Sequence, residues 1–431
     1  MLGLLLGGLL VVLMFGVPIG IALSLTALSV GILDPVIPIN STFVFRNLIT
    51  ALDSNVLIAI PLFVLSGNIM AKGGISEKIF NFFAYFLGNK TGGLPAAVVV
   101  TCLFYGAITG SAPATVAAVG AMAIPLLVSL GYDLKFVASM LAVAGGLGVI
   151  IPPSIPFIVY GLSTATSVGD LFLAGVLPGL LIALSLILYI VFYFKIKGGE
   201  DKEKLQKNYE ELRSKNFFHV LGSSIFALLT PVIILGGIYS GIVTPTEAAN
   251  ISVFYALIVS LFIYRSLKFK DLIGIMKDSV GMVAPILLIV AAATALSRGL
   301  TMMQVPQQIS MFIADTFTSR IALLLAINGF LLLVGMLLEP LSAIMILSPI
   351  FMPVLQQYGI DPIHFGMIMT VNLAIGFVTP PVGMNLYVAS SMTKVSVLEI
   401  AKNALPFAIM MLVALMMITF IPQISLFLVG L

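Results

Sequence analysis

Charged residues are scarce in this chain of 431 residues. Asp, Glu, Lys and Arg make up only 9% of it, whereas 60% of the residues are hydrophobic and the mean hydropathy is +1.21. A water-soluble protein carries about 25% charged residues because its surface must be solvated. The composition therefore excludes a soluble enzyme, a nucleic-acid-binding protein and a disordered chain, and it is typical of a polytopic membrane protein.

Cysteine and histidine are also rare. Cys102 is the only cysteine and lies in an apolar run, so no disulfide and no cysteine-rich metal site is expected. His219 and His364 are too few and too far apart for a zinc centre. No catalytic cluster lies within the apolar segments, so we expect neither an enzyme nor a cofactor other than a coupling ion. The chain start lacks a basic segment and a cleavage site, which favours a retained helix over a signal peptide.

Long apolar segments fill most of the sequence, without the ~10-residue alternation of a membrane β-barrel. We therefore predict an all-α bundle in the bacterial inner membrane. Spanning segments are expected at 2–32, 55–71, 135–169, 171–195, 216–240, 246–265, 280–297, 363–393 and 404–430. Shorter pieces of mixed polarity are expected to lie along the bilayer surface, at 41–52, 75–88, 269–278 and 304–318.

A polar stretch at 195–219 divides the chain near its middle, and the two halves match each other. At an offset of 228 residues, Asp133 meets Asp361, and the Pro-Pro pair at 152–153 meets the pair at 380–381. Several Gly and Ser residues match at the same offset. Such matches are hard to obtain by chance, so the sequence predicts a duplicated architecture.

The positions of Lys and Arg predict the orientation of the chain. We interpret the apolar segments 94–130 and 320–357, each broken in its middle, as re-entrant hairpins. With this interpretation, 17 of the 20 basic residues fall on the side of the N-terminus, and only Arg46, Arg298 and Arg320 fall on the other. Because cytoplasmic loops are rich in Lys and Arg, we expect a cytoplasmic N-terminus and a periplasmic C-terminus. The two repeats are then inverted relative to each other.

Four interruptions of apolar helices carry the functional prediction. Two are the hairpin tips at 110–115 and 338–342, and two contain a Pro-Pro pair, at 148–154 and 376–385. A Pro-Pro pair removes amide donors and prevents helix continuation, and backbone freed inside lipid needs new partners. Inverted repeats with interrupted helices are typical of secondary transporters. The structural alternative is that each proline only kinks its helix.

Carbonyl and hydroxyl oxygens at the interruptions are suited to Na⁺, and the N-terminal ends of the following half-helices are suited to a carboxylate. The candidate Na⁺ ligands are Ser66, Gly110, Ser111, Gly148, Gly335, Glu339, Gly376 and Thr379. The candidate substrate-binding residues are Thr115, Pro153, Ser154, Pro381, Gly383 and Asn385.

Several polar residues have competing or purely structural interpretations. Glu339 is the only carboxylate at a hairpin tip, which favours ion binding or gating, although a tip in contact with water would explain it as well. Ser66 could instead form an interhelical hydrogen bond. Asp133 and Asp361 are expected to cap helix N-termini, and the segment 244–247 (TPTE) is expected to form a capping box.

At these motifs the chain resembles the large membrane subunit (DctM or SiaM type) of the tripartite ATP-independent periplasmic (TRAP) transporters. The resemblance covers essentially the whole chain. Its strongest marks are GSAPATVAAVGAMAIP at 110–125, GVIIPPSIPFIVYG at 148–161, GIVTPTEAA at 241–249, LEPLSAIMILSPI at 338–350 and GFVTPPVGMNLYV at 376–388.

The resemblance implies an inverted-repeat elevator transporter with two re-entrant hairpins and two discontinuous helices. In this arrangement 94–195 and 320–431 form the two halves of a mobile transport domain. The segment 1–93 forms scaffold and arm helices, and 196–319 forms the cytoplasmic linker and further scaffold.

The resemblance also implies Na⁺-coupled import of an organic anion, such as a C4-dicarboxylate or sialic acid. The implied partners are a small four-helix membrane subunit and a periplasmic substrate-binding protein. We expect the small subunit to be a separate polypeptide, because the first span starts at residue 2. A stand-alone Na⁺/anion symporter and a gated anion channel remain the alternatives.

The four interruptions lack the arginine that is typical of a carboxylate-binding site. Arg298, the nearest candidate, is expected at the outer surface. We therefore expect helix dipoles and hydroxyl groups to replace a salt bridge, and the affinity of the membrane part for its substrate to be low.

Overall fold

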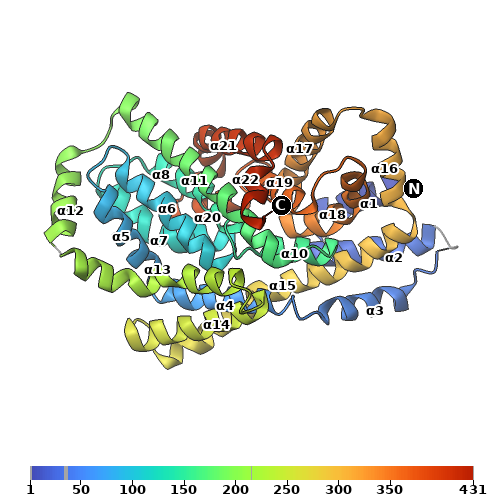
Figure 1. Cartoon of the computed structure of the whole chain (residues 1–431), viewed down its shortest axis with the longest axis horizontal. Coiled ribbons are helices and arrows are strands. Elements are labelled where there is room, and N and C mark those ends of the chain that lie inside the picture. The colour runs from blue at the N-terminus through green and yellow to red at the C-terminus, as the bar shows by residue number, and fades with distance from the viewer. Residues whose placement is uncertain (1, 34–36, 215, 431) are drawn as a thin grey trace.

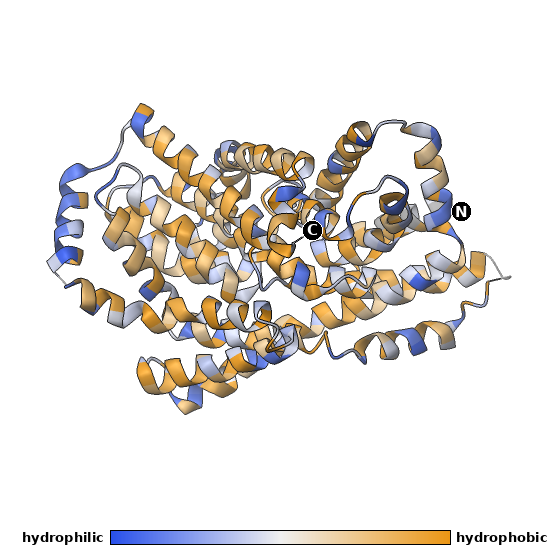
Figure 2. Ribbon diagram, viewed as in Figure 1, coloured by the Kyte–Doolittle hydropathy of each residue, from blue (hydrophilic) through white to orange (hydrophobic). Residues whose placement is uncertain are grey.

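The computed structural model describes residues 2–33, 37–214 and 216–430, and within these ranges it contains helices and connecting segments but no strand. Eight helices are long and apolar enough to cross a membrane, or up to ten if each of two bent helix pairs is one span. Hydrophobic residues cover most of the molecule, whereas hydrophilic residues gather on α12 (Lys202–Ser214) at its left edge (Figure 2). The chain is an all-helical membrane protein with several spans. Lys215, counted among the basic residues above, lies outside the described ranges.

The first half of the chain contains eleven helices before the polar helix α12 (Figure 1). They are α1 (Leu2–Met14), α2 (Ile19–Leu33), α3 (Ser41–Leu52), α4 (Ala59–Lys72), α5 (Ile75–Leu87), α6 (Gly93–Thr109), α7 (Ala112–Ser129), α8 (Leu134–Ala144), α9 (Leu147–Ile150), α10 (Ile155–Thr164) and α11 (Val168–Lys197).

The second half repeats much of this order. Its helices are α13 (Phe217–Tyr239), α14 (Pro245–Ile258, extended by a π-helical turn at Val259–Ile263), α15 (Phe269–Met302), α16 (Val305–Thr316), α17 (Arg320–Leu337), α18 (Pro340–Gln357), α19 (Pro362–Gly376), α20 (Met384–Thr393), α21 (Val397–Phe420) and α22 (Gln423–Leu426, followed by a 3-10 turn at Phe427–Val429).

In both halves a pair of helices joined by a two-residue turn precedes a broken helix and then a long helix. The pairs are α6–α7 and α17–α18, the broken helices are α8–α10 and α19–α20, and the long helices are α11 and α21. The two interruptions with Pro-Pro pairs are real breaks in the helices, so prolines that only kink them are excluded. Both Pro-Pro peptide bonds are cis.

The predicted helix caps are confirmed. The Asp133 carboxylate accepts a hydrogen bond from the amide of Phe136 at the start of α8 (3.1 Å). Asp361 accepts from the amide of Ile363 at the start of α19 (2.7 Å). Before α14, the Thr244 hydroxyl accepts a hydrogen bond from the amide of Glu247, and the Glu247 carboxylate accepts one from the amide of Thr244. These side chains satisfy amides that have no partner within the helix.

The segment 2–32, predicted as one span, is instead two helices. α1 ends at Met14 and α2 begins at Ile19. Between them Gly16 adopts a positive φ of 77°, which glycine tolerates at little cost, and Pro18 has no amide hydrogen to continue the first helix.

The predicted separation of a surface helix at 269–278 from a span at 280–297 is wrong, because both belong to the 34-residue helix α15. No Gly or Pro interrupts the junction, and the Ser279 hydroxyl donates to the carbonyl of Ile275 within the helix (2.8 Å). α15 is attached to α4 by a hydrogen bond from Asn68 to the Ser279 hydroxyl (2.8 Å) and by an ion pair between Lys72 and Asp278 (2.6 Å). The other three predicted surface pieces form α3, α5 and α16.

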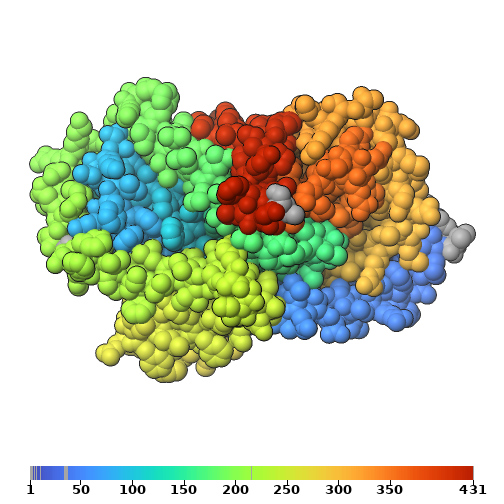
Figure 3. Space-filling model, in the orientation of Figure 1, coloured from blue at the N-terminus to red at the C-terminus, as the bar shows by residue number. Residues whose placement is uncertain are grey.

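Helices of the two halves pack against each other throughout the molecule. α21 packs on α8 and α11, α10 packs on α18, and α20 packs on α7. On another side α15 contacts α2, α3 and α4, and α14 contacts α4. In the space-filling view, the C-terminal residues (red) lie between α11 (green) and the orange residues of α17 and α18 (Figure 3).

Glycines allow each broken helix to touch the backbone of the helix that precedes its turn. A Cβ atom added at Gly106 of α6 would stand 2.7 Å from the Cα of Gly148, and one added at Gly376 would stand 2.7 Å from the Cα of Gly335 in α17. A side chain at either position would collide with backbone, which cannot rotate away. The predicted ion-site residues Gly148, Gly335 and Gly376 therefore have a packing role.

We expect Gly376→Ala to destabilise the protein by about 1–3 kcal/mol, because the new methyl group overpacks a backbone contact. Gly329→Ala is the matched control, since no atom lies within 4 Å of a Cβ at this α17 position. Alanine favours the helix there, so its stability should stay equal or rise slightly. Thermal unfolding of the purified variants measures both effects, and equal melting temperatures for Gly376→Ala and the parent would contradict the close contact.

Candidate functional site

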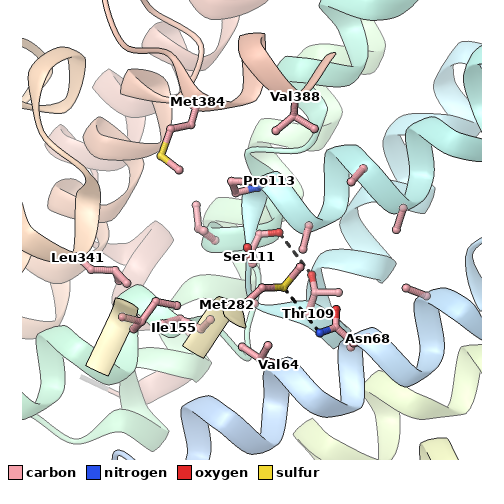
Figure 4. A pocket seen from close by; sticks show the side chains of 18 of the residues that line it. Val64, Asn68, Thr109, Ser111, Pro113, Ile155, Met282, Leu341, Met384 and Val388 are labelled. Atoms are coloured by element: carbon pink, nitrogen blue, oxygen red, sulfur yellow. Dashed lines mark hydrogen bonds between the residues drawn. The ribbon is translucent and has the colours of Figure 1, made fainter. Parts of the chain in front are cut away.

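A cavity of about 790 Å³ lies between the broken helices on one side and α4 and α15 on the other. Gly110 and Ser111 of the first turn and Glu339 of the second border it, together with Val149 and Phe377 from the breaks. Figure 4 shows side chains that point into this space from helices far apart in the sequence, including Val64 of α4 and Met282 of α15. One cavity thus meets all four interruptions.

Four helix N-termini reach the cavity. Its lining includes Pro113 in the first turn of α7, Pro156 in that of α10, Pro340 at the start of α18 and Met384 at the start of α20. The first amides of a helix have no partner within it, and the helix dipole places partial positive charge at this end. The helix ends therefore favour a bound anion, in a cavity that is otherwise lined mainly by apolar side chains and also contains the Glu339 carboxylate.

Three of these N-termini have no side-chain cap. Ser111, Ser154 and Gly383 precede α7, α10 and α20, and none of them makes a capping hydrogen bond through its side chain. Glu339 caps α18, where its carboxylate accepts from the amide of Ser342 (3.2 Å). These three helix ends present partial positive charge to an external acceptor such as a carboxylate, although the Ile155 amide of α10 and the Asn385 amide of α20 already donate to backbone carbonyls.

The first turn lies directly against the first break. The amide of Ile155 donates to the carbonyl of Gly110 (3.3 Å), which joins α10 to the turn between α6 and α7. Gly110 has a positive φ of 61°, and a Cβ there would stand 2.8 Å from the carbonyl oxygen of Pro153. A Cβ at Gly148 would similarly stand 2.7 Å from the carbonyl oxygen of Ser111. Four predicted site residues are thus brought together here.

Hydroxyl groups surround this contact. Thr115 donates to the carbonyl of Ser111 (2.9 Å), and its hydroxyl lies 3.1 Å from that of Thr109. Ser66 is fully buried, and its hydroxyl has no hydrogen-bond partner among the described residues. Its neighbour Gly67 packs on Thr109, since a Cβ at Gly67 would stand 3.2 Å from the Thr109 Cα. Most buried hydroxyls in proteins have a hydrogen-bond partner, so the Ser66 hydroxyl is a candidate oxygen ligand.

Ser154, a predicted substrate-binding residue, lies beneath the first break. It is fully buried, and its hydroxyl donates to the carbonyl of Val149 (2.6 Å). This bond closes the first break across five residues and satisfies a carbonyl freed by the Pro-Pro pair. The side chain therefore supports the backbone and does not line the cavity.

The second turn and second break meet more loosely. The amide of Val382 donates to the carbonyl of Met336 near the end of α17 (3.3 Å), and the Thr379 hydroxyl donates to the carbonyl of Ile375 (2.8 Å). Pro381 is exposed, whereas Pro153 at the equivalent position is buried. Three predicted residues of this half, Thr379, Pro381 and Gly383, lie in the loop that connects α19 to α20.

Asn385 connects the two halves. Its side-chain amide donates to the carbonyl of Ala142 in α8 (2.8 Å), and its backbone amide donates to the carbonyl of Phe377 (3.0 Å). Its side-chain oxygen is buried without a partner among the described residues. Gly383, immediately before α20, has a positive φ of 51° that shapes the end of the break.

Three polar residues of the cavity were not predicted from the sequence. Asn68 and Lys72 line it from α4, and Thr109 lines it from the end of α6 (Figure 4 shows Asn68 and Thr109). The signal for Asn68 was present, because an amide side chain within an apolar helix needs a partner. Within the described residues, no group of three or more His, Cys, Asp or Glu could hold a metal ion. A cation here would depend on carbonyl and hydroxyl oxygens.

A comparison with known protein families identifies the family of this chain. The model of the family described as "Tripartite ATP-independent periplasmic transporter, DctM component" matches residues 6–424. The chain belongs to the DctM family. DctM proteins are transporter components, so membership supports transport rather than enzyme activity.

Relatives within the DctM family have several named substrates. The chain is 42% identical over 420 residues to the isethionate TRAP transporter permease protein DctMQ of Oleidesulfovibrio alaskensis, covering 97% of this chain and 65% of that protein. It is 41% identical to the C4-dicarboxylate large permease DctM of Pseudomonas aeruginosa (86% and 85% covered). It is 35% identical to the sialic acid large permease SiaM of Vibrio cholerae (96% and 95% covered).

The fold of this DctM-family chain is similar to that of a solved transporter. The YdaH transporter of Alcanivorax borkumensis aligns with a TM-score of 0.60 at 14% sequence identity, covering 87% of this chain and 88% of that one. This likeness concerns the fold alone.

Proposed function

We propose that this chain is the large permease subunit of a Na⁺-coupled tripartite transporter that imports an organic anion. The single observation that carries the proposal is the convergence of four helix N-termini, three of them without a side-chain cap, on one cavity. Isethionate, C4-dicarboxylates and sialic acid are all anions at neutral pH, and amides at helix ends bind either carboxylate or sulfonate oxygens.

The proposed coupling ion would bind behind the two turns. The first candidate site combines the unpartnered hydroxyl of Ser66 with the hydroxyl of Thr115 and the carbonyls of Gly110, Ser111 and Gly148. The second combines the carbonyls of Gly335 and Gly376 with the Thr379 hydroxyl and the Glu339 carboxylate. Oxygen atoms of these types suit a hard cation. Binding of Na⁺ would hold each turn against its break and so complete the anion site.

We infer that the helix pairs α6–α7 and α17–α18 are re-entrant. The first turn contacts Gly148 and Ile155 in the central part of the segment 134–164, and both turns border the central cavity. A turn at the middle of a spanning segment lies at the same depth in the membrane. With this topology, the distribution of Lys and Arg supports inverted repeats with the polar segment 195–219 on the cytoplasmic side.

The cavity separates two groups of helices, which supports an elevator mechanism. Segments 94–195 and 320–431 carry the turns and breaks and form the proposed transport domain, whereas 1–93 and 196–319 form the proposed scaffold and linker. Lys72, which lines the cavity and pairs with Asp278, lies at the predicted cytoplasmic end. The proposed partners are a small four-helix membrane subunit and a periplasmic substrate-binding protein.

Reconstitution into liposomes tests the proposed function. We expect uptake of a radiolabelled organic anion to require an inward Na⁺ gradient, the small subunit and the binding protein together, since the membrane part lacks an arginine in its central breaks. Replacing Na⁺ by K⁺ is the control for ionic strength. Uptake without the two partners would instead favour a stand-alone symporter, and Na⁺-independent currents of many ions per opening would favour a channel.

Thr379→Ala should raise the Na⁺ concentration for half-maximal uptake several-fold, because one proposed oxygen ligand is lost. Thr393→Ala is the matched control. Its hydroxyl donates to the carbonyl four residues earlier, as that of Thr379 does, but it lies at the far end of α20. The Na⁺ dependence of uptake is measured at equal protein levels, and an equal half-saturation for the two variants would remove Thr379 from the ion site.

A further inference from the structure

A second, smaller cavity lies at the other end of the interface between the two groups of helices. It has a volume of about 310 Å³, within the range of small-molecule sites, and its walls come from α3, α10, α15 and α18. Thr50, Ser163, Thr294, Ser297 and Arg298 supply hydroxyl groups and a guanidinium to the lining. Arg298 lies on the predicted periplasmic side, opposite the Lys72 end of the large cavity.

Arg298 is exposed at the cavity and brings a positive charge that no acidic side chain of the lining balances. None of the lining residues is acidic, and within the described parts of the chain Arg298 forms no ion pair. One N–H of its guanidinium donates to the side-chain oxygen of Asn47, which is buried in α3. Asn47 therefore positions the group and leaves its other donors available, and a guanidinium pairs well with a planar carboxylate.

α15 connects the two cavities. Gly281, Met282 and Ile289 line the large cavity, and the next residue, Val290, begins the lining of the small one, which ends at Arg298. A helix rises 1.5 Å per residue, so this one helix follows the path between the groups of helices for about 25 Å. The small cavity thus lies on the same track as the proposed anion site, nearer the predicted outer surface.

We propose that the small cavity is an outer binding site for a carboxylate, in which the imported anion contacts Arg298 before it reaches the central site. This inference rests on the proposed import of an organic anion. Arg298 binds the carboxylate, Asn47 is a positioning residue, and the hydroxyls of Thr294 and Ser297 face the same space. The site supplies on the scaffold the cationic group that the central breaks lack.

Cysteine reactivity tests the site without any need for transport. In membranes that contain the complete transporter, a Thr294→Cys reporter is placed in a Cys102→Ala background and treated with an anionic or a cationic methanethiosulfonate reagent. The measured quantity is the labelling rate with the anionic reagent divided by the rate with the cationic reagent. We expect this ratio to be at least about fivefold higher with Arg298 than in Arg298→Gln, because the substitution removes one nearby positive charge. Succinate should slow the labelling in a saturable way, whereas the uncharged succinamide should not.

Arg46→Gln is the matched control, because it removes the same charge from α3 outside the cavity lining and should keep the charge preference and the succinate protection. Equal effects of Arg46→Gln and Arg298→Gln, absent succinate protection, or an unreactive reporter would each overturn the proposal. The proposal would also be overturned if Arg298→Gln weakened only the association with a protein partner and left the labelling and the succinate protection unchanged. Labelling requires neither Na⁺ nor uptake. The experiment can therefore show the outer site even if the proposed Na⁺-coupled transport is wrong.

Discussion

Peptide groups that leave a helix inside an apolar bundle must find new partners, and the rest of this structure depends on how they do so. Ser154 satisfies one carbonyl of the first break, and the Gly110 carbonyl accepts from the amide of Ile155. Glycines at 148 and 376 allow the backbone contact that makes such bonding possible. The N-terminal ends of α7, α10 and α20, which have no side-chain cap, border a cavity. Unwinding the helices thus supplies both the opening and the polar groups that a small anion needs.

The two halves share one order of helices but differ in the polar groups at their breaks. The first break is buried and surrounded by hydroxyls, whereas the second is partly exposed and has a carboxylate, Glu339, at its turn. Asn385 and the pair Ser163–Ser348, whose hydroxyls lie 2.5 Å apart, join the halves directly. These bonds attach the two halves to each other, as the proposed joint movement of both breaks against α4 and α15 requires.

Local features of the sequence predicted much of the fold. The Pro-Pro pairs and the caps at Asp133 and Asp361 act within a few residues, so their effects can be inferred without the partner surface. The repeated order of elements follows from matches between the two halves of the sequence itself. The break at Gly16–Pro18 was not predicted because the residues on both sides of it are apolar. The continuity of α15 was missed because charged residues stop at Asp278, although the helix continues past them. Long-range relations escaped the sequence too. That Asn68 would bond to Ser279, or that Thr109 would lie beside Thr115, depends on packing between distant helices.

Hydrogen–deuterium exchange of the two breaks tests the central claim most directly. The account predicts that Na⁺, but not K⁺ at equal ionic strength, slows exchange of the amides in 147–155 and in 376–385, because the ion fixes each turn on its break. The polar helix α12 should exchange equally in both salts. Identical exchange of both breaks in Na⁺ and K⁺ would contradict the claim that these unwound segments form the ion-coupled site.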